Sequence, residues 1–229
     1  MQIGEPTGRL IAIGDVHGCA DELDELLELI APTVDDCLVF LGDILNRGPD
    51  SARVIQRVKS LGNARCLLGN HELRMLRYRH TGDPSLLKDY DWETLRQIGR
   101  DDWAYLESLD LTLEFPELDT VFVHGGFLPD RPWNEQGAEI VTRIQVVDPQ
   151  NGAFGKRAQM PNGVSWAERW KGPPFVVCGH TPREDVYRRP WSLCIDTACV
   201  YGGKLTAYDV RSEKFLQVKA RKTYIRKNA

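Results

Sequence analysis

The amino-acid sequence predicts an α/β fold. Two observations support this prediction: short apolar runs of strand length alternate with segments of helical periodicity, and several of these runs end at a glycine next to a polar residue. The 229 residues are enough for one domain with a large core. We therefore expect a single domain over residues 1–229, with a helical insertion over residues 73–118.

The N-terminal half shows the alternation of strands and helices most clearly. Apolar residues between Leu23 and Ile30 recur at helical spacing, and a second helix is expected to begin after Pro49 and to end before Gly62. Residues 72–109 also show helical periodicity and are rich in charge. The strands predicted in this half cover residues 10–13, 37–41 and 64–68.

The C-terminal half is less regular. Residues 120–124 and 175–178 are predicted strands, and residues 193–196 and 204–208 are expected to form a closing β pair. Residues 131–170 lack clear periodicity, so we expect long loops with some helix there.

The composition is that of an ordinary soluble globular protein, with 42% hydrophobic and 27% charged residues. The net charge of −4 provides no overall basic field, so we expect no membrane partner and no stable binding of nucleic acid. The N-terminal residues show no signal peptide, and the apolar runs are too short to span a bilayer, which predicts a cytoplasmic location. The basic tail, residues 220–229, is expected to be solvated and frayed, and a binding arm is the alternative. The oligomeric state is left open.

The six cysteines show no CxxC pair and no tight spacing. Several lie in apolar runs, where a free thiol behaves as a small hydrophobic residue. We expect reduced structural thiols rather than disulfides or zinc ligands. The cysteines are Cys19, Cys37, Cys66, Cys178, Cys194 and Cys199.

Five short segments each combine the end of a predicted strand with glycine and with polar residues that can bind a metal. Strand ends converge on one rim in open α/β folds, so these side chains are expected to lie together. Each segment alone also fits a turn, a helix cap or a structural histidine, but five of them in this order predict a metal site. Carboxylate, imidazole and amide ligands together suit Mn, Fe, Zn or Co. The candidate ligands are Asp15, His17, Asp43, Asn70, His124 and His180.

These motifs resemble those of the calcineurin-like metallophosphoesterases, and in particular the phosphoprotein-phosphatase group. The resemblance extends from Leu10 to about Val218, and it implies a four-layer α/β/β/α sandwich. The motifs that carry it are GDVHG at 14–18, GDILNRG at 42–48, GNHE at 69–72, VHGG at 123–126 and GHT at 179–181.

The resemblance also implies roles for the site residues. Two divalent metal ions, most often manganese, would be bridged by Asp43. A hydroxide between the metals would attack phosphorus in line. Arg47 would grip the phosphoryl oxygens, and His71 would protonate the leaving oxygen. The first metal would be held by Asp15, His17 and Asp43, and the second by Asp43, Asn70, His124 and His180.

The closing segment, IDTACVYGGKLTAYDV at 195–210, is similar to that of the symmetrical diadenosine tetraphosphatases within this group. Ala198 departs from the glycine that is common there. Asn46 stands where protein phosphatases carry an aspartate that pairs with the catalytic histidine, and an amide adds no charge to that pair. Arg143 matches a second phosphate-binding arginine of that branch, and a surface arginine is the alternative.

The sequence indicates the substrate less clearly than it indicates the fold or the metal site. Asn46 favours a phosphoanhydride, since a nucleoside phosphate leaves without much help from an acid, whereas a serine alkoxide needs a proton. Dinucleoside polyphosphates are therefore the first hypothesis, and phosphoserine, phosphothreonine or phosphotyrosine in proteins is the second. A non-catalytic phosphate-binding protein is a remote third. Trp92, Trp103, Trp133, Trp166 and Trp170 would offer stacking surfaces for a base, although core packing is the simpler role for each.

Overall fold

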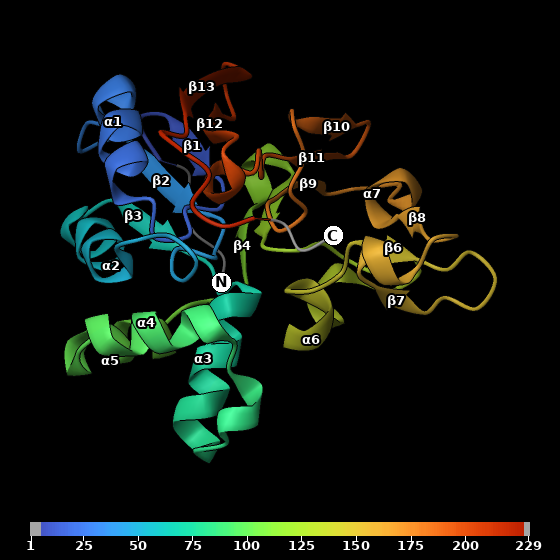
Figure 1. Cartoon of the computed structure of the whole chain (residues 1–229). Coiled ribbons are helices and arrows are strands. Elements are labelled where there is room, and N and C mark those ends of the chain that lie inside the picture. The colour runs from blue at the N-terminus through green and yellow to red at the C-terminus, as the bar shows by residue number, and fades with distance from the viewer. Residues whose placement is uncertain (1–5, 227–229) are drawn as a thin grey trace.

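Two five-stranded sheets form the centre of the computed structural model, which describes residues 6–226 (Figure 1). In the first sheet the order is β13 (Lys214–Lys219), β12 (Lys204–Asp209), β1 (Leu10–Ile13), β2 (Cys37–Phe40) and β3 (Ala64–Cys66). In the second it is β10 (Tyr187–Arg189), β11 (Ser192–Cys194), β9 (Phe175–Cys178), β5 (Thr120–Val123) and β4 (Thr112–Phe115).

Alternation of side chains along the strands creates the layers. In β1, Leu10 and Ala12 point into the cluster between the two sheets, whereas Ile11 and Ile13 point into the cluster under the helices. The side chains of β2 alternate between the same two clusters. Because both faces of these strands are covered, their sequences are continuous apolar runs. Burial of each leucine or isoleucine side chain here contributes about 1.5–3 kcal/mol.

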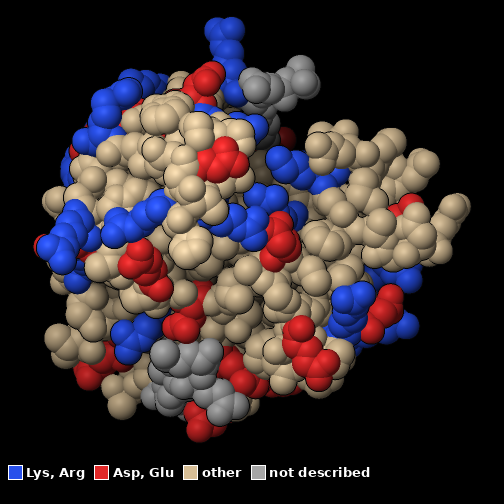
Figure 2. Space-filling view, turned by 90° about the horizontal axis from the view of Figure 1, so that it is seen from below, with Lys and Arg blue, Asp and Glu red and all other residues tan. Residues whose placement is uncertain are grey.

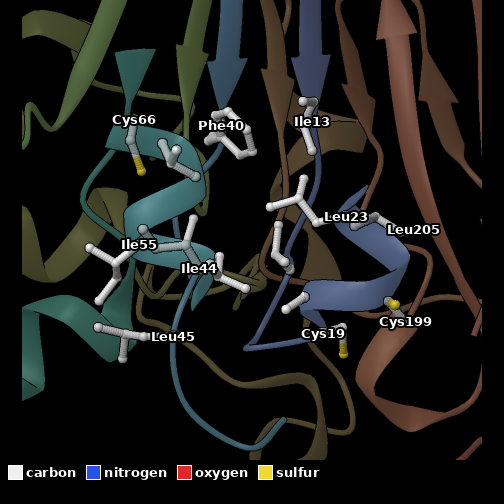
Figure 3. Close-up of a cluster of buried hydrophobic side chains, with 14 of the residues drawn as sticks. Ile13, Cys19, Leu23, Phe40, Ile44, Leu45, Ile55, Cys66, Cys199 and Leu205 are labelled. Carbon is white, nitrogen blue, oxygen red and sulfur yellow. The ribbon is translucent and has the colours of Figure 1, made fainter. Parts of the chain in front are cut away.

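The first sheet is covered on its outer face by α1 (Ala20–Ile30) and α2 (Ser51–Ser60). Figure 3 shows Leu23 of α1 and Ile55 of α2 beside Ile13 and Phe40 of the sheet. Asp50 ends the preceding loop by accepting a hydrogen bond from the backbone N–H of Arg53, which caps α2.

The helical block consists of α3 (Asn70–Thr81), η1 (Pro84–Leu86), α4 (Asp89–Gln97) and α5 (Arg100–Glu107), and it lies below the first sheet in Figure 1. The predicted insertion over 73–118 is not helical to its end. Thr112–Phe115 forms β4, which pairs antiparallel with β5, and η2 (Pro116–Leu118) follows it. The alternation in β4 is too short to separate it from helical periodicity by sequence alone.

The segment 131–170, predicted as long loops with some helix, contains a small sheet. Its strands are β6 (Val146–Val147), β7 (Phe154–Gly155) and β8 (Val164–Ser165), and strands of two residues carry no readable periodicity. Short helices complete it. They are η3 (Trp133–Glu135), α6 (Ala138–Val141), η4 (Arg157–Gln159) and α7 (Trp166–Arg169).

The predicted closing β pair is wrong. β11 joins β9 and β10 in the second sheet, whereas β12 joins β1 and β13 in the first. Between them lie η5 (Cys199–Tyr201) and a single bridge from Ala198 to Lys204. The two segments are neighbours in sequence, but they pair with strands of different sheets.

The prediction of a frayed tail is also wrong for residues 220–226; residues 227–229 lie outside the described part. Ala220 is buried, and the Arg221 backbone N–H donates to Glu22 Oε1 at 2.9 Å. The Tyr224 hydroxyl donates to the same oxygen at 2.7 Å. The Tyr224 N–H also bonds the carbonyl of Val200 at 3.0 Å. The buried carboxylate of Glu22 thus anchors the tail on α1.

Parallel strands place the polar motifs at one rim. β1, β2 and β3 are parallel to one another, and so are β5, β9 and β11. Each of the five motif loops follows the carboxyl end of one of these parallel strands. None of the helices within residues 6–226 combines the length and apolar character needed to cross a bilayer.

Candidate metal centre

Asp43 lies at the centre of the predicted site. Its Oδ2 atom is 3.5 Å from Nε2 of His17 and 3.4 Å from Nε2 of His124. Potential ligand atoms of Asp43, His17 and His71 lie within 4.8 Å of one another, and so do those of Asp43, His124 and His180. Asp43 belongs to both groups, as a carboxylate that bridges two metals must.

Asp15 and Asn70 complete the set. Asp15 Oδ2 is 4.0 Å from His17 Nε2, and its Oδ1 accepts a hydrogen bond from the backbone N–H of His180 at 3.0 Å. Asn70 Oδ1 is 3.2 Å from His124 Nε2. The fold therefore brings all six predicted ligands together from five separate loops.

Backbone carbonyls orient two of the histidines. Nδ1 of His17 is 3.1 Å from the carbonyl of Leu45, and Nδ1 of His124 is 2.8 Å from that of Leu41. A carbonyl only accepts, so these nitrogens donate and the Nε2 atoms face Asp43. Arg47 Nη1 donates to His17 Nε2 at 2.9 Å, which requires a lone pair on that nitrogen. Hydrogen bonds from the ring nitrogen that faces away from the cluster, as at Nδ1 of His17 and His124, are typical of metal-binding histidines.

The charge balance of the cluster fits a cation. Burial raises the pKa of Asp15 well above its usual value, and the carboxylates of Asp196 and Asp43 raise it further. Burial lowers the pKa of His17 to about 3. At His124 burial disfavours the protonated ring, but the carboxylates of Asp43 and Asp15 raise the pKa of this histidine to about 10. Divalent ions would neutralise these buried carboxylates, so the residues present fit the metals that the sequence predicts.

Left-handed backbone concentrates at the site. The φ angles of His17, Asp43 and His180 are 49°, 48° and 65°, and those of Asn46 and Arg47 are 71° and 70°. Such conformations cost roughly 1–3 kcal/mol each for residues other than glycine, and they cluster at functional sites. Five of them around one carboxylate cluster indicate that the fold holds these side chains in place for function.

Gly69 and Gly179 let the backbone approach the carboxylates. A Cβ on Gly179 would lie 2.1 Å from Asp15 Oδ1, and a Cβ on Gly69 would lie 2.3 Å from Asp43 Oδ1. Both contacts are far below van der Waals distance. Neither position can carry a side chain without moving a predicted ligand.

Glu72 organises the loop after β2, a role that the sequence reasoning missed. Its Oε2 accepts hydrogen bonds from the backbone N–H groups of Asp43 and Gly69, at 2.9 and 3.0 Å, and its Oε1 accepts one from Ile44 at 3.0 Å. Burial raises the pKa of Glu72 to about 7. Its position in the GNHE motif is the sequence feature that could have indicated this role.

His71 lies at the N-terminus of α3, with Nε2 buried, without a hydrogen-bond partner and 4.0 Å from Asp43 Oδ2. Its Nδ1 is 3.2 Å from both Asn46 Nδ2 and Arg74 Nη2. Asp91 Oδ1 accepts from these two groups, at 2.7 Å each. The amide nitrogen of Asn46 must face Asp91, since an oxygen there would meet the carboxylate. Because both neighbours of Nδ1 donate, the proton of the neutral ring lies on Nε2.

A carboxylate therefore does reach the His71 network, through Asn46 and Arg74. It comes from Asp91 on α4 and is fully buried. Burial lowers the pKa of His71 well below its usual value, and Arg47 and Arg74 oppose its protonation further. Asp91 is 45 residues from Asn46 in sequence and carries no motif, so only the fold reveals it.

Arg47 lies between two tyrosines at the edge of the cluster. Its guanidinium carbon is 5.6 Å from the ring centre of Tyr90 and 5.4 Å from that of Tyr201. The Tyr90 ring also stacks on His71, with centroids 5.5 Å apart. These aromatic residues come from α4 and η5, and the sequence reasoning did not single them out.

Arg143 reaches the site with its backbone. Its carbonyl accepts a hydrogen bond from His180 Nε2 at 3.1 Å, which leaves Nδ1 of His180 to face the cluster. Burial lowers the pKa of His180 to about 3. The guanidinium of Arg143 is 3.4 Å from Glu139 and half-exposed. Phosphate binding by this side chain stays a prediction.

None of the five candidate tryptophans lines the pocket beside Arg47 in the described structure. Trp166 and Trp170 are buried in the core of the second sheet, and Trp133 packs against it. Trp103 packs under the helices, and Trp92 contacts Tyr78. Core packing is the role of most of them. All six cysteines are free thiols, and five are buried.

Comparisons with known proteins identify the family. The model of the calcineurin-like phosphoesterases matches residues 8–219. The chain is 29% identical over 237 residues to the asymmetrical bis(5'-nucleosyl)-tetraphosphatase of Oceanobacillus iheyensis, with 93% of each chain covered. It is 39% identical over 269 residues to the symmetrical bis(5'-nucleosyl)-tetraphosphatase of Chromohalobacter salexigens, covering 89% of this chain and 95% of the relative.

Solved structures support the same fold and family. A crystal structure described as a "putative diadenosine tetraphosphatase" has a TM-score of 0.84 and 31% identity, with 96% of this chain and 97% of that chain covered. A yeast protein serine/threonine phosphatase shares the fold, with a TM-score of 0.61 at 16% identity. The family matched is one of divalent-metal hydrolases, and these relatives are named as bis(5'-nucleosyl)-tetraphosphatases. With its α/β layers and clustered metal-binding residues, the chain belongs to the calcineurin-like phosphoesterases and is a metallophosphoesterase.

Proposed function

We propose that this enzyme hydrolyses dinucleoside polyphosphates of the diadenosine tetraphosphate type, with two divalent metal ions at the Asp43 cluster. The observation that carries the two-metal site is Asp43, whose carboxylate belongs to both ligand groups. The substrate class is supported by the tetraphosphatase relatives. Manganese is the metal to test first, with iron, zinc and cobalt as the alternatives.

Metals at this site would polarise the phosphoryl oxygens and lower the pKa of bound water. The protein's own residues bind and orient the substrate. Arg47, held between two tyrosines, offers a planar pair of donors to the oxygens of the reacting phosphate. Asp15, Asn70 and the three histidines would hold the metals beside Asp43.

His71 would donate a hydrogen bond from Nε2 to the leaving oxygen. Since Asn46 and Arg74 donate to Nδ1, the ring is held neutral with its proton on Nε2. A neutral imidazole is a weak acid, which suits a leaving group that departs as a stable anion. A nucleoside phosphate is such a group, whereas the alkoxide of a serine is not. The His71 network therefore supports a phosphoanhydride substrate over a phosphoprotein.

The deciding experiment incubates the enzyme with manganese and either diadenosine tetraphosphate or a phosphopeptide. We expect turnover of the dinucleotide to exceed that of the peptide by at least an order of magnitude in kcat/KM. Chromatography of the products then gives the cleaved bond. Two ADP would mean symmetrical cleavage, which the closing segment favours; ATP with AMP would mean asymmetrical cleavage. Turnover of the phosphopeptide alone would refute the proposed substrate.

A further inference from the structure

A basic pocket lies next to Arg47, outside the predicted ligands. Its volume is about 370 Å³, and four of its lining residues are cations: Arg47, Lys156, Arg157 and Arg226. No Asp or Glu of residues 6–226 lines it. Figure 2 shows Lys and Arg side chains around a hollow between the main body and the lobe that carries β6–β8.

That no carboxylate of the described residues lines this pocket is unusual for this chain, in which acidic residues outnumber basic ones by 33 to 29. Basic side chains elsewhere on the surface pair with carboxylates, as Arg53 does with Asp21 and Arg188 with Glu213. Partial burial and the positive charges of Arg143 and Arg47 lower the pKa of Lys156. Like charges held together this way favour an anionic ligand.

Two segments that are distant in sequence build the pocket, and both are anchored. Lys156 and Arg157 lie at the start of η4, directly after β7, where the Arg157 N–H donates to Gln145 Oε1 at 3.0 Å. The side chain of Gln145 lies close to the metal centre, with its Nε2 3.4 Å from His180 Nε2. Arg226 lies two residues after Tyr224, whose hydroxyl donates to Glu22 and docks the tail.

We propose that Lys156, Arg157 and Arg226 form a second phosphate subsite, which binds the phosphates of a polyphosphate chain that do not react. This inference rests on the proposed function, and it deepens it by placing the rest of the substrate. Tyr201 and Arg226 also line a neighbouring cavity of about 770 Å³. Space therefore continues past the basic residues for the group at the far end of the phosphate chain.

The test compares substrates with one phosphate and with several. In Lys156→Ala/Arg157→Ala and in Arg226→Ala, kcat/KM for diadenosine tetraphosphate should fall on the order of tenfold for each lost cation, mainly through KM. Hydrolysis of p-nitrophenyl phosphate, which has a single phosphate, should change less than twofold. The matched control is Arg169→Ala/Lys171→Ala, which removes the same charge from exposed positions. An equal loss with both substrates would overturn the subsite.

A second readout separates the subsite from the proposed substrate. ADP should inhibit p-nitrophenyl phosphate hydrolysis competitively at fixed free manganese, because one of its phosphates would occupy the metal centre and the other the subsite. Its inhibition constant should rise on the order of a hundredfold in Lys156→Ala/Arg157→Ala, which loses two cations, while that of inorganic phosphate stays within twofold. If diadenosine tetraphosphate is not a substrate but ADP behaves this way, the subsite stands and the proposed function falls. An unchanged ADP constant, or no inhibition by ADP, contradicts the subsite.

Discussion

At the scale of single residues, Asp43 is the centre on which the site depends. Its Oδ2 faces two histidines, and its Oδ1 accepts a hydrogen bond from the His71 N–H at 2.9 Å. A carboxylate with both oxygens engaged and with left-handed backbone has little freedom to move. The motif GD alone could not show this, because such a dipeptide also occurs in ordinary turns.

Asp43→Asn should abolish turnover while the protein stays folded. An amide keeps the shape but loses the charge that would bridge two metals, so kcat should fall on the order of a thousandfold and metal content should drop below two ions per chain. Steady-state kinetics and elemental analysis measure the two effects. The exposed Asp130→Asn is the control. A variant that kept most of its activity with fewer than two metals would exclude the two-metal interpretation.

Asp91→Ala tests the network behind His71. Its loss leaves the buried guanidinium of Arg74 without its ion-pair partner, which should lower the free energy of unfolding by about 3–5 kcal/mol. The change also removes the acceptor that orients the Asn46 amide beside His71. We therefore expect a larger fold change in kcat than in KM. The double variant Asp91→Leu/Arg74→Met removes both charges, and it should recover stability but not kcat. Recovery of both would mean that the network is structural and does not position His71.

At the scale of elements, the C-terminal segment shows what sequence periodicity cannot. Residues 220–226 have the composition of a solvated basic tail, yet Tyr224 and Arg221 both bond the buried carboxylate of Glu22. The contact joins positions about 200 residues apart, beyond the range of any local pattern. The prediction of a closing β pair was wrong for a related reason, because β11 and β12 pair with strands of different sheets.

Tyr224→Phe should therefore destabilise the fold. The change removes one hydrogen bond to a buried carboxylate whose Oε2 already has no partner, at a cost of about 1–3 kcal/mol. Urea denaturation followed by fluorescence measures the shift in midpoint. Tyr78→Phe, at a half-buried tyrosine of α3, is the control. Equal midpoints for Tyr224→Phe and the wild type would show that the tail contributes nothing to stability.

At the scale of the whole molecule, an ion pair between the buried carboxylate of Asp36 and the partly exposed Arg9 ties the start of the first sheet to the end of α1. Asp36 accepts hydrogen bonds from Arg9 Nη2 at 2.7 Å and from the Thr33 N–H at 2.8 Å, while Arg9 Nη1 donates to the carbonyl of Ile30 at 3.0 Å. The Arg9 guanidinium lowers the pKa of Asp36. Because the folded protein keeps Asp36 ionised, its stabilising effect is full above the unfolded pKa of about 4 and is lost as the pH falls below it.

Asp36→Asn should lower the free energy of unfolding by about 2 kcal/mol at pH 7, and the difference from wild type should shrink toward pH 3 and below. Urea titrations of metal-free protein at several pH values measure it, so that loss of metal does not contribute. The neighbouring Asp35→Asn, at an exposed carboxylate, should change little at any pH. A difference that stayed constant with pH would assign the effect to packing.

The sequence by itself determined the α/β class, the seven predicted strands and the six candidate ligands, because these depend on local patterns: apolar runs, glycines and metal-binding side chains next to each other in the chain. The tertiary structure decided what surrounds them. Asp91 behind His71, the tyrosines around Arg47, the docked tail and the basic pocket all join segments that are far apart in sequence. Such contacts depend on which surfaces the folded layers bring together, and no local pattern records that.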